Sequence, residues 1–280
     1  MEQKEYVRRG YLHEDFRLFH LKDKLGDENE YHYHEFDKLV IFVSGKVNYM
    51  IEGITYPLQP WDILLISNHT IHKAVIDTNE EYERYIIYIS PHFTDANNTE
   101  DTQLMKCFKT AEERRFYLLR PGLERQENVR RIVRNLEDET TSGGYGSDVG
   151  AKVTMLQLLI QLNRSVLLEE TREAQPSVIY DPKIASVISF INDNLTGELS
   201  VESLAARSYV SKFHFMRRFK ELTGYTVHNY VLQKRLINAA ELIKGGVPAA
   251  KASVQSGFKD YSTFQRAFKK MFGVNPIKMK

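Results

Sequence analysis

Cysteine is almost absent from this chain of 280 residues, which contains only Cys107. A single thiol excludes an internal disulfide and a zinc site built from several cysteines. Long apolar runs are missing as well, since the strongest apolar stretches, such as 156–168, are interrupted by Gln, Asn and Arg. The first ten residues, MEQKEYVRRG, lack the apolar core of a secretory signal. These absences predict a cytoplasmic protein with no membrane partner.

Net charge is also small, at +1, but it is unevenly distributed along the sequence. Residues 182–280 contain 16 Lys and Arg against 6 Asp and Glu, a charge of +10. The preceding residues hold the other 22 basic and 31 acidic residues, a charge of −9. Such asymmetry favours a module that binds a polyanion and is attached to something else. The alternative is a basic, solvated surface without a partner.

The first hundred residues have the pattern of β-strands. Short runs rich in Val, Ile, Tyr and Phe are separated by turn signals such as Ser44-Gly45; the runs are 39–43, 47–51, 63–66 and 85–89. This spacing, with little helical periodicity, is typical of an antiparallel barrel or sandwich. We therefore predict an α+β multidomain protein whose β domain covers residues 1–100.

From about residue 102 the pattern becomes helical, and we predict a helical dimerisation segment over 101–170. Its last helix carries apolar residues on a four–three repeat, at Val149, Val153, Leu156, Ile160 and Leu167. Asn163 fills the remaining position, and a second stripe beside it contains Met155, Leu159, Leu162 and Val166. Two interpretations remain open for the first stripe. It packs against the β domain, or it forms the seam of a homodimer in which Asn163 sets the register.

A polar linker is predicted at 171–181, followed by a domain that is helical throughout. Asp181-Pro182 is typical of a helix start, with an acidic N-cap and proline at the first helical position. Between 182 and 280, the order of short helix, turn and longer helix occurs twice. The two repeats cover about 200–223 and 248–272, and the predicted helices include 227–244 and 261–272.

The two longer helices are related by an internal repeat. At an offset of 49 residues, five pairs are identical: Phe215 and Phe264, Arg217 and Arg266, Phe219 and Phe268, Lys220 and Lys269, Gly224 and Gly273. Helical periodicity predicts two core stripes, one of Phe215, Phe219 and Leu222 and one of Phe264, Phe268 and Met271. The opposite faces carry Phe213, Met216, Arg217 and Lys220 in the first helix, and Ser262, Gln265, Arg266 and Lys269 in the second.

These outer faces have the chemistry that reads a DNA groove. Arg bridges two acceptors of guanine, Gln pairs with adenine, and an exposed Phe or Met contacts a thymine methyl. Lys neutralises a phosphate and orients the helix without reading sequence. A plain helical bundle with polar outer faces is the alternative, but it does not explain why Phe213 and Met216 lie on the solvent side.

The last hundred residues resemble the DNA-binding domain of the AraC/XylS family of transcription regulators. The match is carried by LAARSYVSKFHFMRRFKELTG (204–224), YVLQKRLINAAELIK (230–244) and SGFKDYSTFQRAFKKMFGVNP (256–276). The resemblance implies two helix-turn-helix units joined by a long helix and bound to double-stranded promoter DNA, with homodimers common and RNA polymerase as a further partner. It places base contacts at Phe213, Met216 and Arg217 in the first unit, and at Tyr261, Ser262, Gln265 and Arg266 in the second.

The β domain resembles the cupin-like barrel that precedes this DNA-binding domain in many members of the family. The matching residues are His32-Tyr33-His34, Gln59-Pro60-Trp61-Asp62 and His72. Catalytic cupins bind a metal with two such histidines, a glutamate about four residues later and a distant histidine, but Lys38 stands at the glutamate position. Because a protonated ammonium offers no lone pair, we expect no metal, no cofactor and no catalytic residue.

We instead predict a pocket for a small polar effector, such as a sugar or a carboxylated metabolite. Its candidate residues are His32, His34, Lys38 and His72, with Trp61 as an apolar wall or as packing for its turn. The protein would then be an effector-responsive transcription regulator and not an enzyme. A metal-dependent cupin enzyme fused to a DNA-binding domain and a regulator without an effector are the alternatives.

Overall fold

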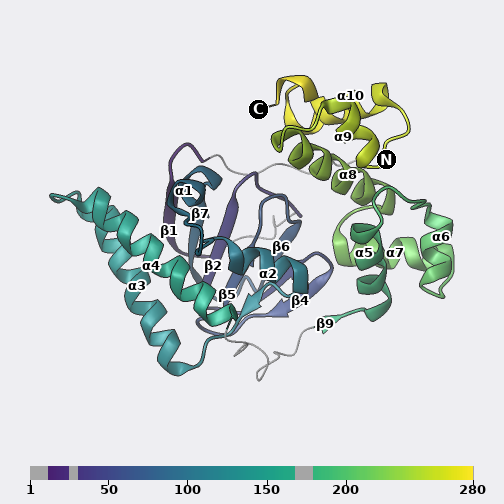
Figure 1. The fold of residues 1–280 in the computed structure, drawn as a ribbon. Helices are drawn as coiled ribbons and strands as arrows, with labels where there is room; N and C mark the ends of the chain where they lie inside the picture. The colour runs from purple at the N-terminus through teal and green to yellow at the C-terminus, as the bar shows by residue number, and fades with distance from the viewer. Residues whose placement is uncertain (1–11, 25–30, 168–178, 280) are drawn as a thin grey trace. The chain divides into compact units, whose positions relative to one another are not determined.

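The computed structural model describes residues 12–24, 31–167 and 179–279. The chain divides into two compact units; the main change from one to the other falls between Ile179 and Tyr180, and Glu52–Ile54 are grouped with the second unit (Figure 1). We refer to them as the N-terminal unit and the C-terminal unit. The linker predicted at 171–181 lies mostly outside the described residues. None of the described helices is long and apolar enough to cross a membrane.

Two β-sheets form the N-terminal unit. The first has the strand order β1-β7-β2-β5-β8, and in the second β3 lies between β6 and β4. The strands are β1 (Phe16–Asp23), β2 (Asp37–Ser44), β3 (Val47–Ile51), β4 (Ile54–Pro57), β5 (Ile63–Ile66), β6 (His72–Ile76), β7 (Tyr82–Ile89), β8 (Leu118–Leu119) and β9 (Ile179–Tyr180). The pairs β1–β7, β2–β7, β2–β5, β5–β8 and β3–β6 are antiparallel. The predicted antiparallel β domain is confirmed, and closure into a barrel stays a prediction.

Strand β2 is the centre of the first sheet. Every residue from Asp37 to Phe42 is buried, so both faces of the strand are covered. A strand covered on both faces needs a continuous apolar run, which explains the sequence LVIFV at 39–43. Asp37 and Lys38 are the polar exceptions, at 8% and 5% exposure. Successive residues of a strand point to opposite faces, so these two charged groups lie on opposite sides of the sheet.

Helices follow the strands in the N-terminal unit. They are α1 (Pro91–Asn97), α2 (Lys106–Arg114), α3 (Leu123–Ser142) and α4 (Ser147–Leu167), and α3 and α4 lie side by side (Figure 1). In α4 the second apolar stripe is buried, as with Met155 and Leu159 at 0% exposure. The first stripe is on the surface, with Val149 and Val153 each at 60% exposure. At 100° per residue, the centres of the two stripes are roughly 115° apart, so the exposed stripe lies beside the buried one.

Asn163 corrects the expectation of a register-setting residue at a dimer seam. Its Nδ2 donates hydrogen bonds to the carbonyl oxygens of Leu104 at 2.7 Å and Leu159 at 2.8 Å. Its Oδ1 accepts one from the backbone N–H of Cys107 at 2.8 Å. Because Lys106–Arg114 form α2, the Asn163 amide satisfies one of the N–H groups that the first turn of α2 leaves without a helical acceptor. The side chain therefore holds α2 against α4.

The C-terminal unit is helical. It contains α5 (Pro182–Asp193), α6 (Val201–Arg207), α7 (Lys212–Thr223), α8 (Val227–Lys244), α9 (Ala249–Gln255), α10 (Tyr261–Phe272) and a short 3-10 helix, Pro276–Lys278. Side chains cap the starts of α7 and α10, where Ser211 accepts from the N–H of His214 and Asp260 from that of Thr263. Both helices end at a glycine with positive φ, Gly224 at 76° and Gly273 at 75°.

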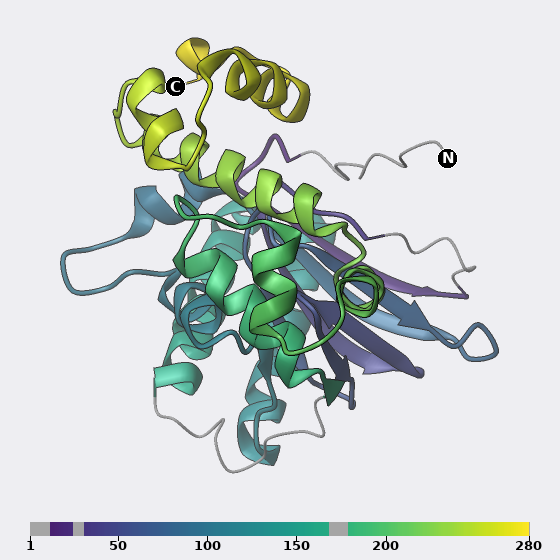
Figure 2. The same ribbon diagram turned by 90° about the vertical axis from the view of Figure 1, so that its right-hand side faces the viewer.

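The core of the C-terminal unit contains the two predicted aromatic stripes. Phe215, Phe219, Phe264 and Phe268 are each 0% exposed, and Leu222 is 8% exposed. Met271 is half-buried and packs against the cluster that contains Phe264 and Phe268. The periodicity therefore predicted the buried faces of α7 and α10 correctly. Figure 2 shows α8 in light green, lying between the green helices α5–α7 and the yellow helices α9 and α10.

Candidate functional sites

Helix α7 presents the predicted polar and apolar groups on its outer face. Phe213 is 82% exposed, Arg217 and Lys220 are exposed, and Met216 is half-buried. The Nε of Arg217 is 3.8 Å from Oε1 of Glu221, one turn later on the helix. An exposed ion pair of this kind contributes of order 0.3–0.5 kcal/mol, so it does not prevent Arg217 from contacting another group.

The equivalent face of α10 is less uniform. Ser262, Arg266 and Lys269 are exposed, whereas Gln265 is half-buried. Tyr261 is half-buried as well, with its ring centroid 5.6 Å from that of the buried Phe264. The ring of Tyr261 therefore belongs partly to the core, and its hydroxyl is the group left for an outside contact.

Tyr209 was missed by the sequence analysis. It lies in the turn between α6 and α7, is 89% exposed and has a φ of 54°. A bulky residue in the left-handed region is strained, and such strain is concentrated at functional positions. The sequence signal was an aromatic residue in a short turn, four residues before the exposed Phe213.

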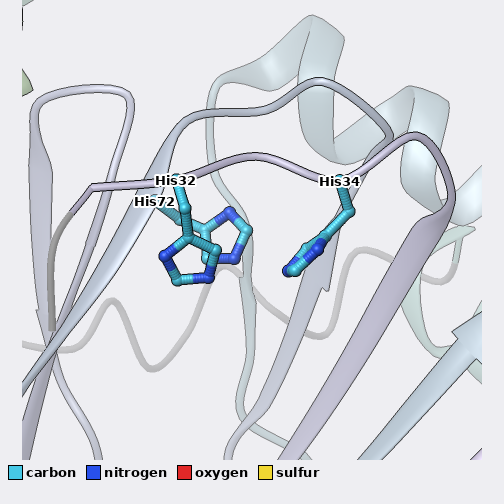
Figure 3. A group of neighbouring side chains, drawn as sticks. All are labelled: His32, His34 and His72. Carbon is cyan, nitrogen blue, oxygen red and sulfur yellow. The ribbon is translucent and has the colours of Figure 1, made fainter. Parts of the chain in front are cut away.

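Three histidines of the N-terminal unit lie together, as the sequence predicts. His32 and His34 come from the segment before β2 and His72 from the start of β6, and their ligand nitrogens lie within 4.8 Å of one another (Figure 3). Backbone hydrogen bonds of 3.0 Å in both directions between His32 and His72 hold the two segments in register. The cluster is enclosed, with exposures of 8% for His32, 3% for His34 and 0% for His72.

Lys38 reaches this cluster from β2. Its Nζ donates to the hydroxyl of Tyr49 at 3.2 Å and lies 3.4 Å from Nε2 of His72. Nδ1 of His72 is 2.9 Å from the carbonyl oxygen of Thr70, which only accepts, so Nδ1 carries the proton and Nε2 accepts from Lys38. Burial, with the Lys38 ammonium and the other two histidines, holds the pKa of His72 well below its usual value. Tyr49 is a further member of the cluster that the sequence analysis missed.

Trp61 is the predicted site residue that the structure does not bring to this cluster. It lies in the turn before β5 with a φ of 70°, and the guanidinium of Arg130 on α3 covers its ring at 4.4 Å. The backbone N–H of Trp61 donates to the carbonyl oxygen of Phe42 at 2.6 Å. Phe42 is four residues from Lys38 along β2, a distance of about 13 Å. Trp61 therefore packs its turn, the second of the two roles predicted for it.

Comparisons with known proteins cover both units. Residues 21–159 match the family described as AraC-like ligand binding domain, and residues 204–280 match a helix-turn-helix domain family. The multiple antibiotic resistance protein MarA of Escherichia coli (strain K12) is 34% identical over 96 residues, 34% of this chain and 76% of MarA. The chain belongs to the AraC family of transcription regulators.

Another relative agrees over a longer part of the chain. A protein of Photobacterium leiognathi named Probable transcriptional regulator LumQ is 23% identical over 257 residues, which are 91% of this chain and 94% of LumQ. Among solved structures, the DNA-binding domain of AdpA, in complex with a target DNA, is 27% identical and covers 34% of this chain and 87% of that chain, with a TM-score of 0.33. This AraC-family chain is a DNA-binding transcription regulator with an N-terminal ligand-binding domain, and its relatives are regulators and not enzymes.

The histidine cluster of this AraC-family regulator does not suit a metal ion. Three imidazoles with nitrogens within 4.8 Å of one another are a spacing that a divalent cation accepts. The lone pair on Nε2 of His72, however, already accepts from the Lys38 ammonium at 3.4 Å. A cation at this position would stand next to a buried positive charge, which opposes its binding. The absence of a metal ion from this cluster stays a prediction.

Asp37, on the opposite side of β2, gives a prediction about stability and pH. Burial raises the pKa of Asp37 to about 7 from 3.8, although the N–H of Asn68 donates to its carboxylate at 2.9 Å. Between pH 3.8 and about pH 7 the folded state binds more protons than the unfolded state, so the free energy of unfolding decreases as pH rises. Asp37→Asn should raise that free energy by about 1–3 kcal/mol at pH 8 and change it little at pH 4.

Urea denaturation followed by tryptophan fluorescence measures this effect. Trp61 is the single tryptophan, so its emission reports on the N-terminal unit alone. An equal change in the free energy of unfolding at pH 4 and pH 8 would contradict the prediction.

Proposed function

We propose that this regulator reads a promoter site in double-stranded DNA with the outer faces of α7 and α10. The observation that carries the proposal is the repeat itself: two capped helices with buried aromatic faces present exposed Arg217 and Arg266 at equivalent positions. In this proposal Phe213, Met216 and Arg217 contact bases from α7, and Tyr261, Ser262, Gln265 and Arg266 do so from α10. Lys220 and Lys269 contact phosphates.

Two recognition helices on one chain suit two successive turns of the major groove, about 34 Å apart. One protomer would then read a non-palindromic site, because α7 and α10 carry different side chains. Selection of bound duplexes from a random pool tests this directly. The proposal expects a selected site with two different half-sites about one helical turn apart, and a pool without any enriched sequence would contradict it.

The effector site of the proposal is the cluster of His32, His34, Lys38 and His72, to which we add Tyr49. The Lys38 ammonium is 5% exposed and contacts the Tyr49 hydroxyl and Nε2 of His72. An oxygen of an anionic ligand in the cluster would be attracted by this positive charge. This favours a carboxylated metabolite over a neutral sugar. The domain limits of the proposal are those predicted from the sequence.

Lys38→Met tests the effector site. The variant keeps an unbranched side chain but removes the ammonium, so it should lose the thermal stabilisation given by an anionic effector. The probe is a panel of sugar acids, small dicarboxylates and neutral monosaccharides, each tested with wild type and variant. At a ligand concentration 100 times Kd, wild type gains about 2.7 kcal/mol of stability.

The matched control for this experiment is Lys73→Met, on β6 and close to the ring of Tyr31. The control should respond to the panel like wild type. A compound that stabilises wild type and Lys38→Met equally would show that the cluster is not its site.

A regulator without an effector is the second candidate, favoured by the enclosure of the histidine cluster. The four predicted residues that lie in the cluster, His32, His34, Lys38 and His72, are at most 8% exposed, so a ligand would need the domain to open. Absence of any stabilising compound in the panel would support this candidate.

Assembly and transcription complete the proposal. We propose a homodimer through the exposed stripe of α4, because this apolar face beside the buried one is otherwise in contact with water. RNA polymerase is proposed as a further partner. Effector binding would act by changing the balance between two arrangements of the protein, which requires only different affinity for the two.

A further inference from the structure

Arg235 ties the long helix α8 to the first helix-turn-helix unit. Its Nε donates to the carbonyl oxygen of Leu195 at 2.7 Å, and its Nη2 donates to that of Gly197 at 3.0 Å. Both acceptors are in the loop between α5 and α6, and α6 packs on α7. A movement of this loop relative to α8 would therefore displace α7, the first recognition helix.

The second helix-turn-helix unit packs against the same loop. Gly257, between α9 and α10, has a φ of +86°, and a Cβ at this position would lie 2.3 Å from the carbonyl oxygen of Leu195. The same Cβ would lie 2.9 Å from Nε of Arg235. Asn238, about one turn after Arg235 on α8, donates from Nδ2 to Oγ of the fully buried Ser256 at 3.0 Å. Loop 195–197, helix α8 and turn 256–257 thus meet at one junction.

We propose that this junction sets the separation and orientation of α7 and α10, and thereby the half-site spacing that the protein prefers in DNA. The inference rests on the proposed reading of DNA by both helices. Arg235 is a positioning residue that acts through the loop and the turn and not through the bases. The planar guanidinium donates to two carbonyls in one fixed geometry, which the single ammonium of lysine does not reproduce. A rigid connection between two binding modules raises affinity only for sites whose spacing matches it.

The experiment uses the full chain and the site selected from a random DNA pool by wild type. Duplexes are made with the selected spacing between half-sites and with spacings one and two base pairs shorter and longer. Further duplexes carry one half-site only. Arg235→Lys should bind the duplex with the selected spacing about tenfold more weakly than wild type does. Its affinities for the five spacings should lie within about threefold of one another, because the modules remain linked but lose their fixed geometry. Binding to each single half-site should equal that of wild type.

A second variant and a control complete the test. Gly257→Ala should move the preferred spacing away from the wild-type value, because its Cβ cannot approach the carbonyl oxygen of Leu195. Arg207→Lys is the control, since the guanidinium of Arg207 lies 3.9 Å from the ring centroid of Phe190 and touches no part of the junction. Its spacing profile should be that of wild type.

Two outcomes overturn the inference. In one, Arg235→Lys and Gly257→Ala keep the wild-type order of affinities across all spacings. In the other, they weaken single half-sites as much as the full site, which indicates local damage to one recognition helix. A wild-type selection that yields one half-site only would instead overturn the proposed two-helix reading, and the spacing inference with it.

Discussion

Replacing Arg217 or Arg266 with alanine is expected to weaken binding to the selected DNA site by about 5- to 150-fold for each variant. This corresponds to the loss of ~1–3 kcal/mol for a bidentate contact between arginine and guanine. Each variant should also relax specificity at one base pair, and the two positions should lie in different half-sites. Binding isotherms on the selected duplex and on its single-base variants measure both effects.

Lysine variants separate base reading from general attraction to DNA. Lys220→Ala and Lys269→Ala should weaken binding to all sequences alike and reduce the slope of log K against log salt by about one each. Arg207→Ala serves as a control for the loss of one positive charge outside the two recognition helices. Unchanged affinity and unchanged sequence preference in both arginine variants would show that α7 and α10 do not read the bases.

The second large effect is expected at the apolar stripe on the outer face of α4. Val153→Asp together with Ile160→Asp should convert a dimer into a monomer, since the two side chains are 60% and 37% exposed in the single chain. Burial of a side chain of this size contributes ~1.5–3 kcal/mol, and each dimer would lose four. The dimer Kd should therefore increase by about a thousandfold or more. Sedimentation analysis over a range of concentrations measures it.

The helix supplies a matched control for this variant. Gln161 is half-buried on α4, and at 100° per residue it lies roughly 110° away from the centre of the stripe. Gln161→Asp adds a charge away from the stripe and should leave the dimer intact. The thermal stability of the N-terminal unit should be similar in all variants because the buried face of α4 is unchanged. A wild-type protein that is monomeric at all concentrations would contradict the proposed dimer.

Local sequence signals were most accurate in the C-terminal unit. Helices α8 and α10 begin and end where the sequence predicts, at Val227 and Lys244 and at Tyr261 and Phe272. Both are bounded by N-cap side chains and glycines, which act over a few residues. The buried faces of α7 and α10 follow from helical periodicity, because the spacing of large aromatic residues decides which face can enter a core.

Signals that depend on distant contacts were less accurate. Asn163 fitted the apolar repeat of its helix, yet its amide contacts the start of α2, 56 residues earlier in the chain at Cys107. Tyr49 joined the histidine cluster only because β3 pairs with β6, where Tyr49 lies opposite Ala74 and Ile51 opposite His72. Trp61 was near the histidines in the sequence pattern but faces Arg130 on α3. Periodicity along one element contains no information about which other element covers it.

The sequence by itself determined the two kinds of unit, the charge of the helical one, the repeat of its longer helices and the faces that they bury. These depend on composition, capping and periodicity, which act within one helix or one strand. Only the tertiary structure decided that Lys38 donates to His72 and that Arg235 and Gly257 meet loop 195–197. Those contacts join residues tens of positions apart in the sequence. Their geometry depends on sheet register and helix packing, which no short stretch of sequence determines.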